Sequence, residues 1–352
     1  MASNGSPTVK QQIEATRVNH PDTIPAIGEP IDNSACWGNA DNIGVFIYPR
    51  KIAIVDDGTF PEVERFVTAF EKTKTPADTG HYSSAQTQKK LGKFKYGLPD
   101  GVTLLGDKAT LLHHDPSNYT KKIVFDVLES KRHNIYYTEE HTVTQEDIAN
   151  AWDLVKKINP NANTFTVLKI ENLREENTEL RYKDFERFLC GLYSPDFRPE
   201  RPLTLKLFNW IDEWSDEPTK ICTDIDLSFG CVPCNETTIN IYKNENGEKK
   251  ICENQIITPS MGTLSYSSSV KVYFFDARHT LPEKNIYGSY NRNGIYIYRG
   301  GRLLTGSNGI LLGLPTGANR GKGIRIHINL PIKYECDDDF CVTTFKTIRN
   351  DH

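Results

Sequence analysis

Residues 43–58, IGVFIYPRKIAIVDDG, carry the pattern that decides the fold of the first half of the chain. The apolar runs 43–48 and 52–55 flank the Pro49-Arg50 turn and are rich in β-branched residues, which predicts two neighbouring strands. Asp56-Asp57-Gly58 follows the second run directly, and apolar residues at helical spacing come after it. The stretch therefore predicts a strand that ends in an acidic turn and leads into a helix.

The acidic turn is the first candidate site. A buried Asp56 at the end of a strand can accept a hydrogen bond from an exocyclic amine such as that of adenine. Gly58 lets a planar ring approach the backbone because glycine has no side chain. The competing interpretation is an ordinary turn, since Asp-Gly pairs are common in turns.

A second candidate site lies upstream, in residues 29–34, EPIDNS. Glu29 and Asn33 stand four residues apart, so a helix would place both on one face. The carboxylate can accept a proton from an attacking water, and the carboxamide oxygen can be a ligand of Mg²⁺. A surface helix without a site is the alternative.

A long segment without periodicity, residues 72–97, follows the acidic turn and its helix. Loops of this length in compact domains are usually lids or binding loops. The segment ends in GKFKYGL, where Gly92, Lys93 and Gly97 precede an expected helix. Backbone N–H groups at such a place can point at phosphates, and the helix N-terminus favours their charge. A solvated basic loop is the competing interpretation.

Further elements complete the first half of the chain. Thr144 is expected to cap a helix whose inner face contains Ile148, Ala151, Trp152 and Val155. Strands are expected at 109–112, 122–127 and 164–170. Thr164 begins the last of these strands, where its hydroxyl can form a hydrogen bond with the buried Asp56.

The pattern changes at residues 195–202, which contain three prolines and form a plausible linker. Beyond it strands dominate, at 237–242, 270–275, 294–299 and 323–330. The sequence therefore predicts an α+β protein with two domains. The expected boundaries are a flexible N-terminal arm over 1–20, a first domain over 21–198 and a second over 199–352.

Composition limits the class of protein. The chain has 352 residues, of which 38% are hydrophobic and 25% charged, as is typical of soluble globular proteins. Its net charge of -4 argues against wholesale electrostatic binding to nucleic acid. No apolar run approaches a membrane span, and the first twenty residues lack the apolar core of a signal peptide. We therefore expect a cytoplasmic or nuclear protein without a membrane segment.

Taken in order, the motifs resemble the ATP-binding site of the GHKL superfamily, which includes gyrase-type topoisomerases, mismatch-repair ATPases, histidine kinases and microrchidia ATPases. GEPIDNS is similar to the acidic-plus-Asn helix of that family, IAIVDDG to its adenine-binding turn, LGKFKYGL to its glycine-rich lid, and NTFTVLKIENL to its late threonine strand. The resemblance covers residues 20–175. It implies the Bergerat fold, a two-layer α/β sandwich with a mixed sheet and helices on one face.

The resemblance implies a role for each candidate residue. Glu29 is the general base that activates water, and Asn33 holds Mg²⁺ beside the phosphates of ATP. Asp56 binds adenine with Gly58 beside it, and Thr164 supports Asp56. Gly92, Lys93 and Gly97 wrap the phosphates. The implied activity is Mg²⁺-dependent ATP hydrolysis coupled to a conformational change, because phosphoryl transfer depends mainly on positioning and charge neutralisation.

The second half is similar to the transducer domain of microrchidia-like and bacterial gyrase-like members, through NGIYIYRGGRLL, GIRIHINLP and FCVTTFKTI. This resemblance implies that Lys346 reaches back to the γ-phosphate as a second catalytic residue. It also implies a homodimer that closes on nucleotide binding, with the N-terminal arm crossing to the partner. A role on DNA or chromatin is expected only by analogy with these relatives.

Three departures from the family pattern keep an alternative open. Phe60 and Lys95 stand where the family usually has glycine, and Pro30 adjoins Glu29 in the expected helix. The alternative is a nucleotide-binding scaffold or regulatory module with slow or absent hydrolysis. Separately, four cysteines could bind zinc, but their irregular spacing favours free thiols; they are Cys222, Cys231, Cys234 and Cys252.

Overall fold

The computed structural model describes residues 7–19, 23–36, 38–60, 63–67, 69–70, 97–174, 182–193, 203–211, 214–224, 233–274, 294–307 and 324–331. The chain forms two compact units. Unit 1 contains Met1–Tyr82, Gly92–Cys190 and Glu200–Asp224, and unit 2 contains Ser83–Leu91, Gly191–Pro199 and Ile225–His352. Each unit holds one mixed β-sheet, so the fold is α+β, as the sequence predicts.

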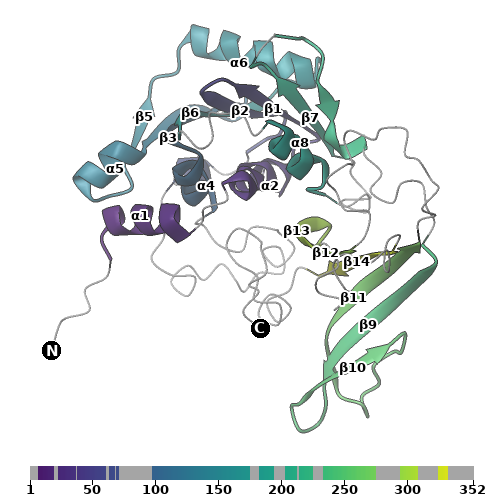
Figure 1. Ribbon diagram of the computed structural model, residues 1–352. Helices are drawn as coiled ribbons and strands as arrows, with labels where there is room; N and C mark the ends of the chain where they lie inside the picture. Colours follow the sequence, from purple (N-terminus) through teal and green to yellow (C-terminus); the bar gives the residue numbers. More distant parts are fainter. Residues whose placement is uncertain are drawn as a thin grey trace, which may run out of the picture. The chain divides into compact units, whose positions relative to one another are not determined.

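Unit 1 is built on an eight-stranded sheet with the order β5-β4-β3-β6-β2-β1-β7-β8 (Figure 1). Its strands are β1 (Asn42–Tyr48), β2 (Lys51–Asp56), β3 (Gly106–His114), β4 (Thr120–Asp126), β5 (Thr138–His141), β6 (Phe165–Leu173), β7 (Thr204–Asn209) and β8 (Lys220–Ile221). Strands β1 and β7 are parallel, and the other neighbours are antiparallel. The expected β1–β2 hairpin is confirmed.

Helices cover both faces of this sheet. On one side lie η1 (Ile24–Ile27), α2 (Gly28–Cys36), α4 (Gly97–Leu105) and α8 (Tyr182–Cys190), and on the other lies α6 (Gln145–Ile158) (Figure 1). The first-half resemblance implied helices on one face only, and α6 departs from it. The physical reason is visible in β2, where Ala53 and Val55 pack against α6 while Asp56 points to α2. A strand that is apolar on both faces needs cover on both.

The inner face of α6 agrees with the prediction. Thr144 caps the helix in a reciprocal arrangement with Asp147, and Ala151 and Val155 are buried. Ile148 and Trp152 are partly buried against the same cluster, whose centre is the stacked pair Phe46 and Phe208 with ring centroids 4.2 Å apart. Helix α3 (Val63–Val67) follows the acidic turn in the sequence.

Pro30 fits α2 without a kink. The 3₁₀ turn η1 precedes the helix, so α2 begins at Gly28 and Pro30 lies in its first turn. N–H groups in the first turn have no acceptor within the helix, so a proline there removes no hydrogen bond. Glu29 and Asn33 therefore lie one turn apart on a regular helix.

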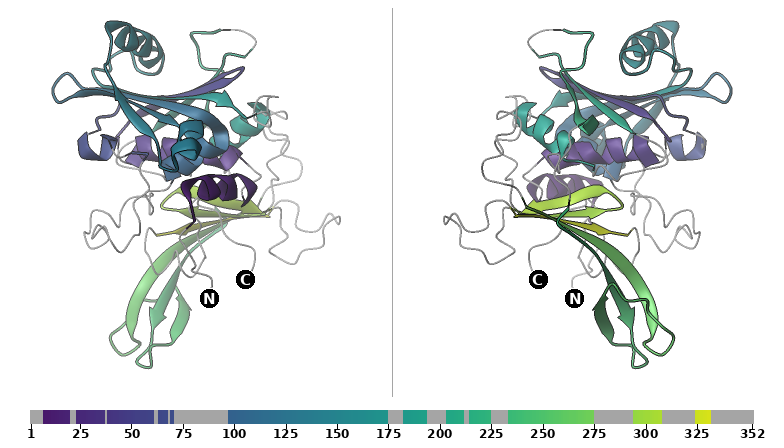
Figure 2. Two further views of the ribbon diagram at one scale, coloured as in Figure 1. Left: turned by 90° about the vertical axis from the view of Figure 1, so that its left-hand side faces the viewer. Right: turned by 90° about the vertical axis from the view of Figure 1, so that its right-hand side faces the viewer.

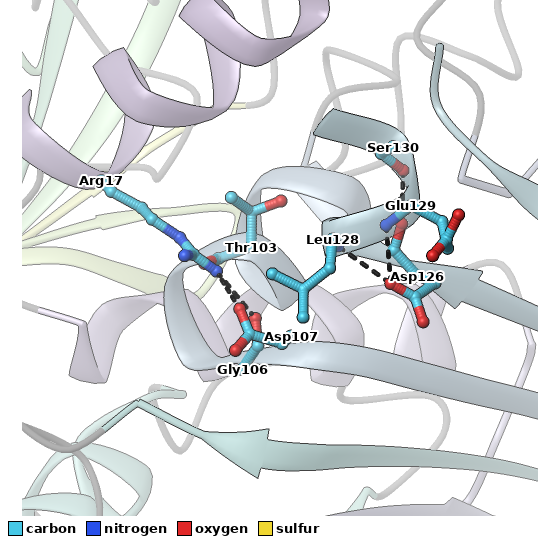
Figure 3. Close-up of polar contacts among 8 residues, drawn as sticks. All are labelled: Arg17, Thr103, Gly106, Asp107, Asp126, Leu128, Glu129 and Ser130. Carbon is cyan, nitrogen blue, oxygen red and sulfur yellow. Dashed lines mark hydrogen bonds and ion pairs between the residues drawn. The ribbon is translucent and has the colours of Figure 1, made fainter. Parts of the chain in front are cut away.

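The N-terminal segment differs from the flexible arm expected over 1–20. Val9–Asn19 form helix α1, which packs on α4 and on α5 (Val127–His133) through the buried Ile13. Figure 3 shows Arg17 of α1 directed at the end of α4, where its guanidinium bonds the carbonyl oxygens of Thr103 and Gly106 and the Asp107 carboxylate. The helix has no apolar face strong enough to predict this docking, because apart from Ile13 it is held by polar contacts, such as those of Arg17 and the bond from the Val9 N–H to the Asn134 side chain.

The same view shows how α5 begins. Asp126 ends β4 and caps α5, because its carboxylate accepts hydrogen bonds from the backbone N–H groups of Leu128 and Glu129 (Figure 3). Ser130 closes the turn by donating to the Asp126 carbonyl oxygen. The cap fixes the start of α5, one of the helices on which α1 packs.

Unit 2 contains a six-stranded sheet with the order β10-β9-β11-β14-β12-β13. Its strands are β9 (Asn235–Lys243), β10 (Lys249–Glu253), β11 (Thr263–Phe274), β12 (Gly294–Arg299), β13 (Arg302–Ser307) and β14 (Ile324–Leu330). The long strands β9 and β11, drawn in green, curve along their length in Figure 2. The expected alternation of β14 is confirmed at Ile328 and Leu330, which join one apolar cluster with Tyr266 and Ile297.

None of the described helices is long and apolar enough to cross a membrane.

Candidate functional site

The carboxylate of Asp56 lies in a buried polar region of unit 1. Asp56 is the last residue of β2 and only 3% exposed. The Ser34 hydroxyl donates to its Oδ2 at 2.6 Å, and the Gly58 backbone N–H donates to its Oδ1 at 3.0 Å. Burial raises the pKa of Asp56 to about 7, although these hydrogen bonds act in the opposite direction.

Thr166, two residues beyond the predicted Thr164, is the threonine that lies opposite Asp56. The Thr164 hydroxyl donates to the backbone carbonyl of Asp57 at 3.0 Å. Antiparallel pairing of β2 with β6 places Thr166 directly opposite Asp56, and its hydroxyl lowers the pKa of the Asp56 carboxyl. The two threonines are two residues apart and share a face, so only the strand register distinguishes them.

Asp57 holds the turn itself. Its Oδ1 accepts from the backbone N–H groups of Asp41 and Asn42, each at 2.9 Å. Its Oδ2 accepts from the side-chain amides of Asn42 at 2.7 Å and Asn159 at 2.8 Å. The carboxylate thus ties the start of β1 and the end of α6 to the end of β2.

Replacement of Asp57 by alanine is expected to destabilise unit 1 by about 2 kcal/mol, because partly buried donors lose their acceptor. Asp57→Asn should recover only part of this loss, since one oxygen becomes a donor that faces other donors. Denaturant unfolding measures both, with Asp153→Asn on the exposed face of α6 as the control. Wild-type stability in Asp57→Ala would contradict the role given to this network.

Gly58 makes the closest backbone approach near the site. A Cβ at this position would overlap the carbonyl oxygen of Gly38 and lie 3.0 Å from the Ala40 nitrogen. The segment around Gly38 is the continuation of α2, anchored by the bond from the Gly38 N–H to the Asn33 carbonyl. Only glycine lets the end of β2 lie this close to α2.

Glu29 is brought to the first residue of α4. Its side chain is only 5% exposed. Its carboxylate fills the space that a Cβ on Gly97 would occupy, because such a Cβ would lie 3.0 Å from the Glu29 Cδ. Gly101 lies one turn later, and a Cβ at that position would be 3.0 Å from the Ala26 carbonyl oxygen. The N-terminal end of α4 therefore abuts the predicted base, a position at which a helix favours negative charge.

The remaining candidates divide between described and undescribed residues. Asn33 is half-buried on α2, one turn beyond Glu29. Gly92, Lys93, Lys95 and Lys346 lie outside the described residues. The structure thus joins Glu29, Asn33, Asp56, Gly58, Gly97 and Thr164 in one region of unit 1.

An aromatic cluster surrounds Phe60, which follows the acidic turn. Phe60 packs edge-on against Phe66 and His113, with ring centroids 5.7 and 6.3 Å apart. The Tyr119 hydroxyl donates to the Phe60 carbonyl at 2.7 Å, and its ring lies 4.8 Å from that of His113. Phe60 therefore belongs to a packed cluster beside the acidic turn.

Sequence reasoning missed three residues that shape the region: Ser34, His113 and Thr166. Ser34 directly follows Asn33, so its place in the predicted site helix was a usable signal. His113 and Thr166 gave none, because their partnership depends on which strands are neighbours.

Within the described part of the chain, no group of three or more His, Cys, Asp or Glu side chains could hold a metal ion. The described cysteines in question, Cys222, Cys234 and Cys252, are free thiols, and Cys231 lies outside the described residues. Cys222 is buried and bonds Cys190, and both this bond and burial raise the pKa of its thiol.

The fold and this region define an α+β protein of two mixed sheets with a buried acidic turn beside a glutamate-bearing helix. No protein-family model matches the sequence, and no curated protein sequence matches it significantly. Among solved structures, the chain is similar to the crystal structure of the N-terminal domain of a DNA repair protein. The identity is 13% and the TM-score 0.49, over 94% of this chain and 95% of that chain.

Proposed function

We propose that this protein binds ATP through unit 1 and hydrolyses it slowly with the help of Mg²⁺, in the manner of the GHKL ATPases that its motifs resemble. The observation that supports this most is the hydrogen bond from Ser34 to Asp56. It connects two motifs that are 22 residues apart in the sequence and brings the helix that carries Glu29 and Asn33 next to the acidic turn, as the proposal requires.

The residues present suit the parts of a nucleotide. A carboxylate has about four acceptor positions, and the described contacts of Asp56 come from three donors: Ser34, Gly58 and Thr166. One acceptor position remains for an exocyclic amine. Glu29, held beside the start of α4, can take a proton from an attacking water.

The donor set also suits Mg²⁺ bound with phosphate. Asn33 offers a single neutral oxygen, and no acidic cluster among the described residues could bind a metal by itself. Mg²⁺ usually takes one or two protein ligands and completes its shell with phosphate and water. Asn33 would hold such an ion, which would supply neutralisation of the phosphate charge, and Glu29 would accept the proton from water.

A calorimetric titration with a non-hydrolysable ATP analogue and Mg²⁺ tests the binding step. We expect saturable binding that Asp56→Asn weakens at least tenfold, because its amide presents a donor where the adenine amine needs an acceptor. Asp153→Asn, the same change at an exposed position on α6, should bind like the wild type. Absence of binding in the wild type would overturn the proposal.

The pH dependence gives a second arm of this test. The folded pKa of Asp56, about 7, lies above the ordinary 3.8, so the folded protein takes up a proton between these values. As pH rises from about 4 to 7, the contribution of Asp56 to the free energy of unfolding falls. Over the same range Asp56 loses its proton, and the ionised carboxylate is the form that can accept a hydrogen bond from adenine. ATP affinity should therefore increase from pH 6 to pH 8 in the wild type and stay level in Asp56→Asn.

A second candidate function is nucleotide binding without hydrolysis, as in a scaffold or regulatory module. Phe60 favours it, because a packed aromatic ring stands where the related family usually has a glycine. A phosphate-release assay separates the two: turnover with the wild type supports the ATPase, and tight binding without phosphate release supports the scaffold.

A further inference from the structure

A row of three polar side chains crosses three strands behind the acidic turn. His113 on β3 lies opposite Thr166 on β6, and Thr166 lies opposite Asp56 on β2. His113 Nδ1 is 3.0 Å from the Thr166 hydroxyl oxygen, and that hydroxyl lies across from the Asp56 carboxyl, whose pKa it lowers. Residues directly opposite each other in antiparallel strands share a face, so the three side chains form a row.

The direction of each bond in the row is determined by its neighbours. His113 also bonds the backbone carbonyl of Phe165, and its Nε2 has no partner among the described residues. Since Nε2 has no partner and a carbonyl only accepts, we assign the one ring proton to Nδ1, where the Phe165 carbonyl and the Thr166 oxygen share it. Thr166 then receives a donor at its oxygen, and its single hydroxyl proton is directed at Asp56.

The surroundings of the His113 imidazole keep the ring neutral and in place. His113 is fully buried, at 0% exposure, among the rings of Phe60, Phe66 and Tyr119. Burial lowers its pKa to about 4, so the ring stays neutral at physiological pH. A neutral ring with one fixed proton holds Thr166 in one orientation.

We propose that His113 is a positioning residue that orients the Thr166 hydroxyl toward Asp56 and so keeps Asp56 an acceptor, which selects adenine, with an amine at C6, over guanine, with a carbonyl there. This inference rests on the proposed function and adds to it a residue that does not touch the ligand. Without the histidine, the hydroxyl of Thr166 can rotate away from Asp56. The carboxylate then loses a donor, is protonated more easily and can donate to a base carbonyl such as that of guanine.

Two substitutions at position 113 separate this role from simple packing. Asn places an amide N–H where the histidine has Nδ1–H, whereas Leu has a comparable branched shape and no donor. The measurement is the ratio of dissociation constants of non-hydrolysable GTP and ATP analogues with Mg²⁺. We expect His113→Leu to lower the preference for adenine about tenfold, the equivalent of one hydrogen bond, and His113→Asn to keep most of it. Equal effects of both variants, or no effect of Leu, would overturn the inference.

A measurement on the unmodified protein guards against variants that fail to fold. Nitrogen-15 NMR of the imidazole should show the proton on Nδ1 and a neutral ring down to about pH 5. A ring protonated on Nε2 would overturn the inference whether or not nucleotide binds. Conversely, the expected tautomer in a wild type that binds no nucleotide would preserve the hydrogen-bond row and reject the proposed function alone.

Discussion

Alanine at position 58 is expected to destabilise unit 1 by about 3 kcal/mol or more, the upper end of the cost of overpacking. The new Cβ would overlap the carbonyl oxygen of Gly38 and lie 2.8 Å from its carbon. Both sides of the contact are backbone, so no side chain can move aside. The Gly38 segment is held by its bond to Asn33, and Gly58 is held by its bond to Asp56.

Denaturant unfolding measures this effect, and Gly101→Ala is the matched control in the same unit. There the added Cβ would lie 3.0 Å from the Ala26 carbonyl oxygen, and the better helix propensity of alanine offsets part of the strain. We expect a change of less than about 1 kcal/mol in the control. If Gly58→Ala were as stable as Gly101→Ala, the close approach of β2 to α2 would be wrong.

The second large effect concerns turnover. Glu29→Gln is expected to lower phosphate release about 10²- to 10⁴-fold while ATP binding survives, because general base catalysis contributes rate accelerations of this size. Glutamine keeps the shape that fits against Gly97 and removes only the ability to accept a proton from water. Single-turnover phosphate release, together with the calorimetric titration, measures both quantities.

Gly97→Ala tests the role of Glu29 in turnover through a change in the residue that it contacts. Its Cβ would displace the Glu29 carboxylate, which is the end of a flexible side chain, so the fold should survive while the base is moved. We expect a similar loss of turnover with nearly wild-type stability, and no loss in Glu146→Gln, an exposed glutamate on α6. Full activity in both Glu29→Gln and Gly97→Ala would remove Glu29 from the mechanism.

Local patterns predicted the elements that carry the site. The apolar runs on either side of Pro49-Arg50 form β1 and β2, and Thr144 caps α6. These features depend on neighbours within a few residues, where turn chemistry and capping act. The same is true of Glu29 and Asn33, which the spacing alone placed on one helix face.

Contacts between distant segments could not be predicted in this way. The docking of α1 depends on Arg17 reaching carbonyl groups about ninety residues away at the end of α4. The position of α6 on the second face of the sheet depends on which strands lie in the middle. Neither contact can be predicted from the spacing of nearby residues, because the partners meet only after the chain has folded.

The sequence by itself determined the α+β class, the strand-turn-helix around Asp56 and the chemistry available at Glu29 and Asn33. Only the tertiary structure decided that Ser34 and Thr166 hold Asp56, that Gly97 contacts Glu29 and that His113 stands behind Thr166. The physical reason is strand register: Thr164 and Thr166 are equivalent in the alternating pattern, and only the pairing of β2 with β6 chooses between them.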